Sequence, residues 1–171
     1  MGTETSGSIL SPSGQNSVVG MKPTIGLLSR SGIVPISSTL DTPGPMTKNV
    51  IDNGILLDAM RGFDASDDKS VQADWNENWY RQQNISLKGK RFGALKNYVE
   101  RDSLYRETLE LLKKAGATIV AFEPPEVKFD GFLSILNIDM KRDLPTYIDA
   151  WVNNKDDVVI TSIEEAVTFN L

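Results

Sequence analysis

The chain of 171 residues contains no cysteine and no histidine. Without cysteine it can form no disulfide, no thiolate nucleophile and no cysteine-ligated zinc or iron–sulfur site. Without histidine it cannot build a Ser-His-Asp triad, the usual zinc-hydrolase ligand set or an imidazole proton shuttle from its own residues. Acid–base chemistry must therefore use lysine, aspartate, glutamate, tyrosine or serine, and we expect neither a metal nor a cofactor.

Positive charge is also scarce, because 18 lysines and arginines face 23 aspartates and glutamates, a formal net charge of −5. Nucleic-acid binding depends on clustered basic side chains, which this sequence lacks, so we expect no nucleic-acid partner. No stretch approaches the roughly 18 consecutive apolar residues that span a bilayer, and no basic start leads into an apolar signal region. These absences predict a cytoplasmic protein without a membrane partner.

Charge is scarcest in the first 46 residues, which hold four charged side chains but seven of the 13 glycines and five of the eight prolines. Residues 17–20 and 24–29 are short apolar runs between glycine and proline, which predicts short strands. Low charge combined with many turn residues indicates a buried surface built from loops. We interpret the chain as one domain of two parts, a Gly/Ser-rich segment at 1–46 and an α/β scaffold at 47–171.

A β-α-β unit is predicted in the middle of the chain. Residues 91–96 and 117–122 have the apolar character of buried parallel strands, and residues 102–115 have a helical apolar spacing. The expected packing face of this helix consists of Leu104, Thr108, Leu111, Leu112 and Ala115. Parallel strands joined by a helix require a right-handed crossover. The predicted fold class is therefore α/β, with a mixed, mostly parallel sheet flanked by helices.

Further helices are predicted on both sides of this unit. A helix over 47–60 would bury an apolar stripe and end before Gly62. The stripe consists of Val50, Ile51, Leu57 and Met60. Residues 132–152 predict one long helix or two, because Pro145 can start a helix or kink one. Two capping-box pairs predict a last helix. They are Thr161 with Glu164 and Ser162 with Glu165. Three aromatic side chains are expected to anchor the polar stretch 63–88. They are Trp75, Trp79 and Tyr80.

The segment Gly2-Thr-Glu-Thr-Ser-Gly-Ser-Ile9 has the composition of a catalytic loop. Small residues around a glycine let successive backbone N–H groups converge on one point and hold an oxyanion. Ser8 would lie beside that point as a nucleophile. The same residues also fit an expression-tag remnant or a frayed terminus. The spacing alone therefore does not distinguish a catalytic loop from a segment without function.

A serine nucleophile needs a base, and the sequence offers few candidates. Lys22, Asp41 and Glu4 are available, or a group from outside this sequence could serve. Lys22 lies between two apolar runs, although a surface position is the commoner outcome for lysine. Asp41 precedes Thr-Pro-Gly-Pro and fits a turn aspartate bonded to its own backbone. Two acidic pairs fit no metal loop and are expected in solvated turns. They are Asp67-Asp68 and Asp156-Asp157.

The run GTETSGSILSPSGQNSVVGMKPTIGLLSRSGIVPISSTLDTPGPMTKNV, with its continuation to residue 60, resembles the second half of the amidase signature. This Gly/Ser-rich segment defines the amidase signature hydrolases. The β-α-β unit, the helix around Asp139 and Trp151 and the SIEEAVTFN segment resemble the family less distinctively. The resemblance implies hydrolysis of a carboxylic amide C–N bond in a small-molecule substrate, through a Ser–cis-Ser–Lys mechanism without histidine.

The resemblance assigns roles residue by residue. Ser8 matches the acyl-accepting nucleophile. The backbone N–H groups that match the oxyanion hole belong to Thr5, Ser6 and Gly7. Thr3 matches a threonine that lines the same loop, and Leu10 stands where many relatives have arginine, so both are substrate-pocket candidates and no anionic substrate group is expected at Leu10. Glu4 stands where aspartate is commoner, a difference that we interpret as structural.

The resemblance also implies that part of the machinery is missing. In the family the catalytic lysine and the cis-serine precede the matched segment, and Lys22 matches a structural lysine. The chain is thus expected to be a carboxy-proximal piece of a single truncated amidase domain, with little turnover alone. One alternative is a non-catalytic fragment or scaffold that requires an upstream polypeptide, and another is a glutaminase resembling the ammonia-producing subunit of glutamyl-tRNA amidotransferase. Exposed surface around residues 18–36 is expected to favour self-association and partial disorder of the amino-terminal region.

Overall fold

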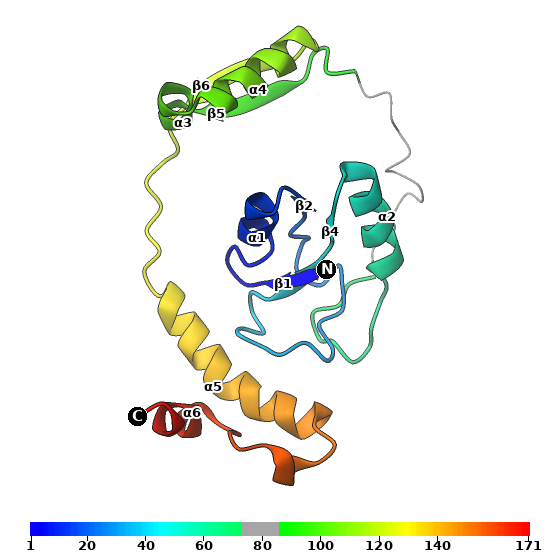
Figure 1. Ribbon diagram of the computed structural model, residues 1–171, viewed down its shortest axis with the longest axis vertical. Helices are drawn as coiled ribbons and strands as arrows, with labels where there is room; N and C mark the ends of the chain where they lie inside the picture. The colour runs from blue at the N-terminus through cyan, green and yellow to red at the C-terminus, as the bar shows by residue number, and fades with distance from the viewer. Residues whose placement is uncertain (73–85) are drawn as a thin grey trace. The chain divides into compact units, whose positions relative to one another are not determined.

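A computed structural model describes residues 1–72 and 86–171, which belong to two compact units (Figure 1). The first unit comprises Met1–Arg81 and Asp130–Leu171, and the second comprises Gln82–Phe129. The predicted anchors Trp75, Trp79 and Tyr80 lie outside the described residues. None of the helices in the described ranges combines the length and hydrophobicity needed to cross a membrane.

The amino-terminal part of the first unit is built from two short antiparallel pairs. Strand β1 (Gly2–Glu4) pairs with β3 (Thr42–Gly44), and β2 (Val19–Gly20) pairs with β4 (Met46–Thr47). Helix α1 (Leu10–Gln15) follows β1 after a loop of five residues. The strands are short because glycine and proline recur within a few residues and interrupt the ladder. The strand predicted at 17–20 is confirmed over Val19–Gly20.

The second predicted strand, at 24–29, is wrong, because this stretch forms turns. The N–H of Leu27 donates to the carbonyl of Thr24 at 3.1 Å, and Gly26 has a φ of +86°. A Cβ at Gly26 would lie 1.9 Å from the carbonyl oxygen of Lys69, so the two chain segments approach each other closely. Gly26 is needed for this backbone contact, which apolar spacing alone does not predict.

Helix α2 (Val50–Met60) begins after Asn49, whose side chain accepts from the N–H of Asp52. The predicted apolar stripe is confirmed at Leu57, which is buried, but is wrong at Val50, which is 69% exposed, and it misses the buried Asn53 and Gly54. The amide of Asn53 donates to the carbonyls of Val19 at 2.9 Å and Pro45 at 3.3 Å. A buried polar side chain thus sets the orientation of the helix against β2 and β4.

The carboxyl-terminal part of the first unit contains α5 (Phe132–Trp151), which is one helix that continues through Pro145. The 3-10 helix η2 (Lys155–Asp157) and helix α6 (Ile163–Phe169) follow. Ser162 caps α6, because its hydroxyl accepts from the N–H of Glu165 at 3.2 Å while the Glu165 carboxylate accepts from the N–H of Thr161 at 2.7 Å. The Ser162 and Glu165 pair is therefore the cap.

The second unit confirms the predicted β-α-β order. Strand β5 (Arg91–Leu95) lies parallel to β6 (Thr118–Phe122), and between them the helical stretch divides into α3 (Lys96–Arg101) and α4 (Ser103–Lys114). The division falls at Asp102, which ends α3 and caps α4 by accepting from the N–H of Tyr105 at 3.0 Å.

The predicted packing face of this helical stretch is wrong in part. Leu104 and Leu111 are exposed, whereas Leu109 is buried. Strand β6 is also largely exposed, because β5 is the one strand that pairs with it among the described residues. The α/β class is confirmed. The predicted mostly parallel sheet is wrong for the described residues, which form one parallel and two antiparallel strand pairs in three separate sheets.

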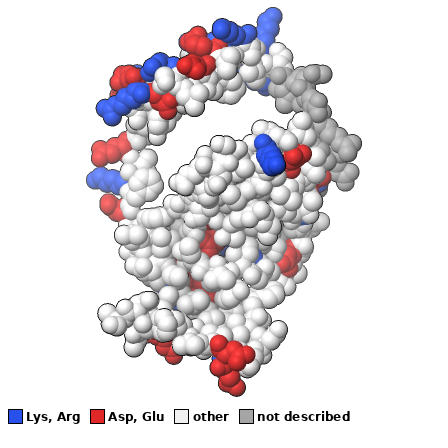
Figure 2. All heavy atoms as spheres, in the orientation of Figure 1, with Lys and Arg blue, Asp and Glu red and all other residues white. Residues whose placement is uncertain are grey.

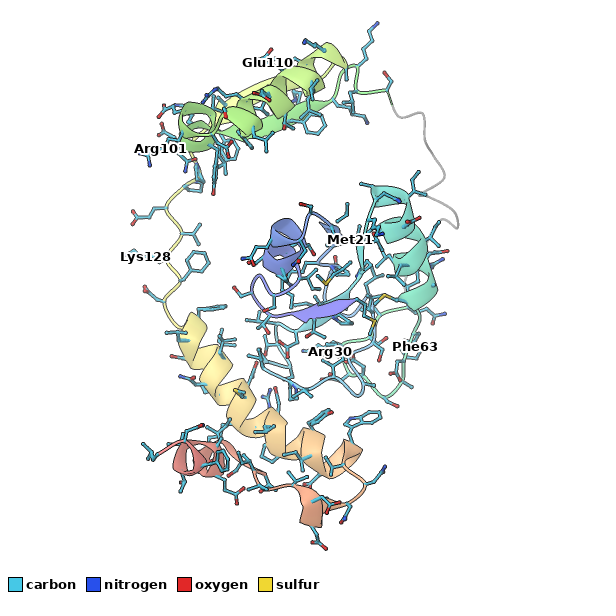
Figure 3. The ribbon with its side chains drawn as sticks, in the orientation of Figure 1. Met21, Arg30, Phe63, Arg101, Glu110 and Lys128 are labelled. Carbon is cyan, nitrogen blue, oxygen red and sulfur yellow. The ribbon has the colours of Figure 1, made fainter. Side chains whose placement is uncertain are left out.

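Charged side chains are distributed differently over the two units. In the view of Figure 2, basic and acidic side chains alternate over the second unit, whereas the visible face of the first unit carries few of either sign. The largest completely buried side chains of the first unit include Ile9 and Leu28, together with the polar Asn53, Thr42 and Ser37. By contrast, Phe63, which follows α2, lies exposed at the edge of the unit (Figure 3). The core of the first unit is therefore partly polar.

Candidate active site

The loop at residues 5–9 connects β1 to α1 and contains the predicted nucleophile. Gly7 has a φ of +102°, a conformation that favours glycine, and it turns the chain so that Ser8 is exposed while Ile9 is completely buried. The N–H of Ser11 donates to the carbonyl of Gly7 at 2.8 Å. The loop is thus held against the first turn of α1, with Ser8 at the surface.

Glu4 holds this loop from the inside. Its carboxylate is buried and accepts from the N–H groups of Ile9 at 2.8 Å and Leu10 at 3.0 Å. Burial raises the pKa of Glu4, but the N–H groups of Leu10, Ile9 and Gly7 and the charge of Lys22 lower the pKa to below its usual value. Glu4 is therefore ionised and serves as an anchor, in agreement with its structural interpretation.

Asp41 holds the same loop from the other side. The hydroxyl of Thr5 donates to Oδ1 of Asp41. The other carboxylate oxygen, Oδ2, accepts from the N–H groups of Ile36 and Ser37, each at 2.8 Å. The prediction that Asp41 lies in a turn is confirmed, since its N–H donates to the carbonyl of Ser37, but its carboxylate bonds to Ile36 and Ser37 and not to its own backbone. Its bond to Thr5, across 36 positions, has no local signal in the sequence.

The remaining predicted site residues lie on the open side of the loop. Thr3 and Ser6 are exposed, and Leu10 is 49% exposed. Within residues 1–72 and 86–171, the Ser8 hydroxyl and the N–H groups of Ser6 and Ser8 have no hydrogen-bond partner. A hydroxyl and two amide donors within three consecutive residues are thus available to a substrate. Lys22, half-buried, is near enough to Glu4 for its charge to act there.

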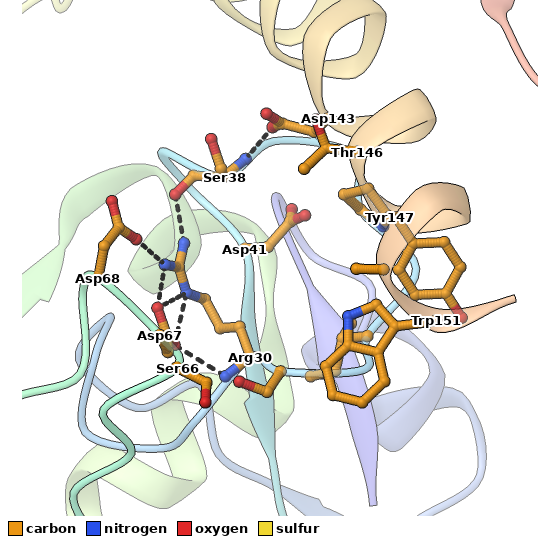
Figure 4. Close-up of a pocket in the computed structure, with 14 residues that line it drawn as sticks. Arg30, Ser38, Asp41, Ser66, Asp67, Asp68, Asp143, Thr146, Tyr147 and Trp151 are labelled. Atoms are coloured by element: carbon orange, nitrogen blue, oxygen red, sulfur yellow. Dashed lines mark hydrogen bonds and ion pairs between the residues drawn. The ribbon is translucent and has the colours of Figure 1, made fainter.

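A cavity of about 300 Å³ lies in the first unit, with Asp41 in its wall (Figure 4). Arg30 lines one side, where its Nε donates to Oδ2 of Asp67 at 3.0 Å and its Nη2 donates to Oδ1 of Asp68 at 3.0 Å. Tyr147 and Trp151, both on α5, line the other side. The prediction that Asp67 lies in a solvated turn is wrong, because it forms a buried ion pair with a residue 37 positions away.

Acid should destabilise the first unit through Asp64. Hydrogen bonds from the hydroxyls of Ser29 and Ser31 and from the N–H of Ser66 lower the pKa of Asp64 from 3.8 to about 2. Because the folded state then binds protons less tightly than the unfolded state, the contribution is present above about pH 4 and is lost as the pH falls toward about 2. Asp67 and Glu4, whose pKa values are also lowered, act in the same direction.

Urea unfolding of the wild type and of Asp64→Asn between pH 6 and pH 2 checks this prediction. The substitution should flatten the decline of the unfolding midpoint at acid pH, and Asp68→Asn, the same change at an exposed carboxylate, should leave the decline unchanged. An Asp64→Asn protein with the wild-type pH dependence would show that Asp64 does not contribute.

Comparison with known proteins decides the family. The amidase family model matches residues 1–158. The chain belongs to the amidase family. It is 40% identical over 134 residues to a glutamyl-tRNA(Gln) amidotransferase subunit of Rhizorhabdus wittichii, covering 75% of this chain and 27% of the relative. It is 44% identical over 124 residues to a probable amidase of Arabidopsis thaliana, covering 70% of this chain and 24% of the relative.

Solved structures of amidases share this fold. An amidase family protein from Bacillus anthracis str. Ames matches with a TM-score of 0.84 and 33% identity, over 99% of this chain and 34% of that chain. A peptide amidase from Stenotrophomonas maltophilia matches with a TM-score of 0.79 and 32% identity, over 99% of this chain and 36% of that chain. The chain spans about a quarter of the length of the two curated relatives. The amidase resemblance of the sequence is confirmed.

Proposed function

We propose that this chain carries the nucleophile of an amidase that hydrolyses a carboxylic amide C–N bond, with Ser8 as the acyl-accepting residue. The proposal rests on the partner-free hydroxyl of Ser8, displayed next to the free N–H of Ser6 on a loop that Glu4 and Asp41 hold in place. Membership of the amidase family supports it. The names of two similar proteins, a probable amidase and a peptide amidase, agree with this reaction.

In the proposed mechanism, the Ser8 oxygen attacks the amide carbonyl carbon as a second serine removes the Ser8 proton and passes its own proton to a lysine. The family resemblance assigns the resulting oxyanion to the backbone N–H groups of Thr5, Ser6 and Gly7. Of these, the N–H of Ser6 is free within the described residues, whereas the N–H of Gly7 interacts with Glu4 and would have to turn toward the substrate. Losing one oxyanion donor costs about 3 kcal/mol. The C–N bond then breaks and the nitrogen leaves with the proton. Water hydrolyses the Ser8 ester, which releases the acid.

We further propose that the lysine and the second serine come from outside these 171 residues. Lys22 matches a structural lysine of the family, and its charge acts on Glu4, an anchor of the loop. General base catalysis contributes about 10²–10⁴ to the rate, so the chain alone should turn over an amide at least about 100 times more slowly than a complete amidase.

Covalent labelling tests the role of Ser8 directly. A fluorophosphonate probe should modify the 171-residue chain slowly and at Ser8, as identified by peptide mass spectrometry. Ser8→Ala should abolish the modification, whereas Ser11→Ala, a control at an exposed serine of α1, should leave its rate unchanged. Equal labelling of Ser8→Ala and wild type would refute the nucleophile assignment, and labelling as fast as that of a complete amidase would refute the outside base.

Two other interpretations, a glutaminase and a non-catalytic scaffold, can be distinguished from a simple amidase by substrate preference and by adding the missing polypeptides. A glutaminase of the amidotransferase type is favoured by the 40% identity to a glutamyl-tRNA(Gln) amidotransferase subunit. It should release ammonia from glutamine in preference to a simple primary carboxamide once an amino-terminal amidase polypeptide and partner subunits are supplied. A non-catalytic scaffold should show no Ser8-dependent hydrolysis under any of these conditions. If the added polypeptides restore hydrolysis and Ser8→Ala abolishes it again, the scaffold interpretation is excluded.

A further inference from the structure

We propose that Asp41 is a positioning residue for the catalytic loop, acting through Thr5, and that helix α5 supports Asp41 through Ser37 and Asp139. The proposal rests on the proposed function, since it concerns how the loop at residues 5–9 is kept ready for reaction. Its basis is a continuous set of hydrogen bonds within the first unit, which we call the Asp41 network. The network consists of Thr5, Asp41, Ser37 and Asp139.

The first link joins the loop to Asp41. The Thr5 side chain is half-buried and its hydroxyl donates to Oδ1 of Asp41, which is only 7% exposed. Thr5 follows β1 directly, and its backbone precedes the free N–H of Ser6. Fixing the Thr5 side chain therefore limits rotation of the peptide plane that aims the Ser6 N–H. Such pre-aimed donors are what stabilise an oxyanion without reorganisation during reaction.

The second link holds Asp41 from the opposite side. Its Oδ2 accepts from the N–H groups of Ile36 and Ser37, each at 2.8 Å, and the N–H of Asp41 donates to the carbonyl of Ser37 at 2.9 Å. Both carboxylate oxygens are thus occupied, one by the loop and the other by the turn at 36–41. Asp41 therefore bridges the loop and the turn, and it acts on the reaction through Thr5.

The third link ties this turn to α5. Ser37 is completely buried, and its hydroxyl donates to Oδ2 of Asp139 at 2.5 Å. The same oxygen accepts from the N–H of Thr39 at 3.2 Å, and Oδ1 of Asp139 accepts from Nη2 of Arg142 at 2.9 Å. Thr5 is thereby connected to Asp139 of helix α5, which lies more than 130 positions later in the chain. Movement of α5 would reach the loop along these bonds.

The network predicts the outcome of paired substitutions at Thr5. Thr5→Val keeps the shape of the side chain but removes its hydroxyl, and should slow fluorophosphonate labelling of Ser8 by about tenfold, since a hydrogen bond to a charged group is among the stronger ones. Thr5→Ser restores the hydroxyl and should recover most of the rate. Thr24→Val, the same change at an exposed threonine in a turn, should leave the rate unchanged. Equal rates for Thr5→Val and wild type would overturn the proposal.

A double-mutant cycle tests whether Thr5 acts through Asp41. Asp41→Ala should slow labelling at least as much as Thr5→Val, and the double variant should be no slower than Asp41→Ala alone, because both changes break the same bond. If the double variant is slowed by the product of the two single-variant factors, the proposal is overturned. If Asp41→Ala does not fold, Ser37→Ala takes its place in the cycle. Ser37→Ala alone should lower the labelling rate by less than Thr5→Val does, and adding it to Thr5→Val should lower the rate no further.

Hydrogen exchange separates this proposal from the proposed function. In Thr5→Val the hydrogen-bonded amides of Ile9, Leu10 and Ser11, which hold the loop to Glu4 and Gly7, should exchange faster than in the wild type, whereas Thr24→Val should leave them unchanged. If Ser8 is never labelled but the exchange changes as expected, the nucleophile assignment fails and the positioning role stands. If exchange at Ile9, Leu10 and Ser11 is the same in Thr5→Val and wild type, the positioning role fails regardless of Ser8 reactivity.

Discussion

Asp67→Asn should lower the free energy of unfolding by about 3–5 kcal/mol, because it leaves the buried charge of Arg30 without its main counterion. The side chains of Arg30 and Asp67 are 11% and 3% exposed. Asp67 accepts from both the guanidinium and the backbone N–H of Arg30, the latter at 2.8 Å. The pair joins the turn that contains Arg30 to the segment after α2.

Urea unfolding followed by circular dichroism measures this loss, with Asp68→Asn as the matched control. Asp68 contacts the same guanidinium, but its side chain is 82% exposed, so removing its charge should cost less than about 1 kcal/mol. Similar losses of unfolding free energy in the two variants would show that the buried pair of Arg30 and Asp67 stabilises the chain no more than the exposed contact of Arg30 with Asp68.

Gly44→Ala should destabilise the chain by about 3 kcal/mol, because β3 leaves no room for a methyl group. A Cβ at Gly44 would lie 2.1 Å from the carbonyl oxygen of Met21 and 2.8 Å from Cδ1 of Ile9. The backbone of Met21 cannot easily withdraw, since its N–H donates to the carbonyl of Pro45 at 3.1 Å. Because Ile9 follows Ser8, we also expect slower fluorophosphonate labelling.

Gly14→Ala, a change at the end of α1, is the control for this substitution. A Cβ at Gly14 would meet no atom within 4 Å, so alanine should stabilise the helix by about 0.5–1 kcal/mol. Urea unfolding of both variants compares the two effects. A Gly44→Ala protein as stable as the wild type would contradict the close packing of β3 beneath the catalytic loop.

The turn at Gly7 and the β-α-β unit were predictable because their signals are local. Gly7 beside Ser8 marks a tight turn that exposes the serine, and the structure has that turn. Two apolar runs separated by a helical pattern predict parallel strands, and β5 and β6 are parallel. The cap formed by Ser162 and Glu165 was also predictable, because the two residues lie three positions apart at the start of one helix.

The wrong predictions for α2 and for Asp67 have the same physical cause. The face of α2 is set by the buried Asn53, whose partners Val19 and Pro45 lie in other segments, and apolar periodicity does not include such bonds. The burial of Asp67 depends on Arg30, 37 positions away. An aspartate in a turn is normally solvated, and only a distant cation makes its burial favourable.

The family, the α/β class and the loop that carries Ser8 can be inferred from the sequence alone, because they depend on residues close together in the chain. The buried anchoring carboxylates, the packed helix faces and the contacts that hold Thr5 become visible only in the folded structure. Those properties depend on hydrogen bonds and ion pairs between distant segments, such as Thr5 with Asp41 and Ser37 with Asp139. Their strength comes from burial, which exists only once the chain has folded.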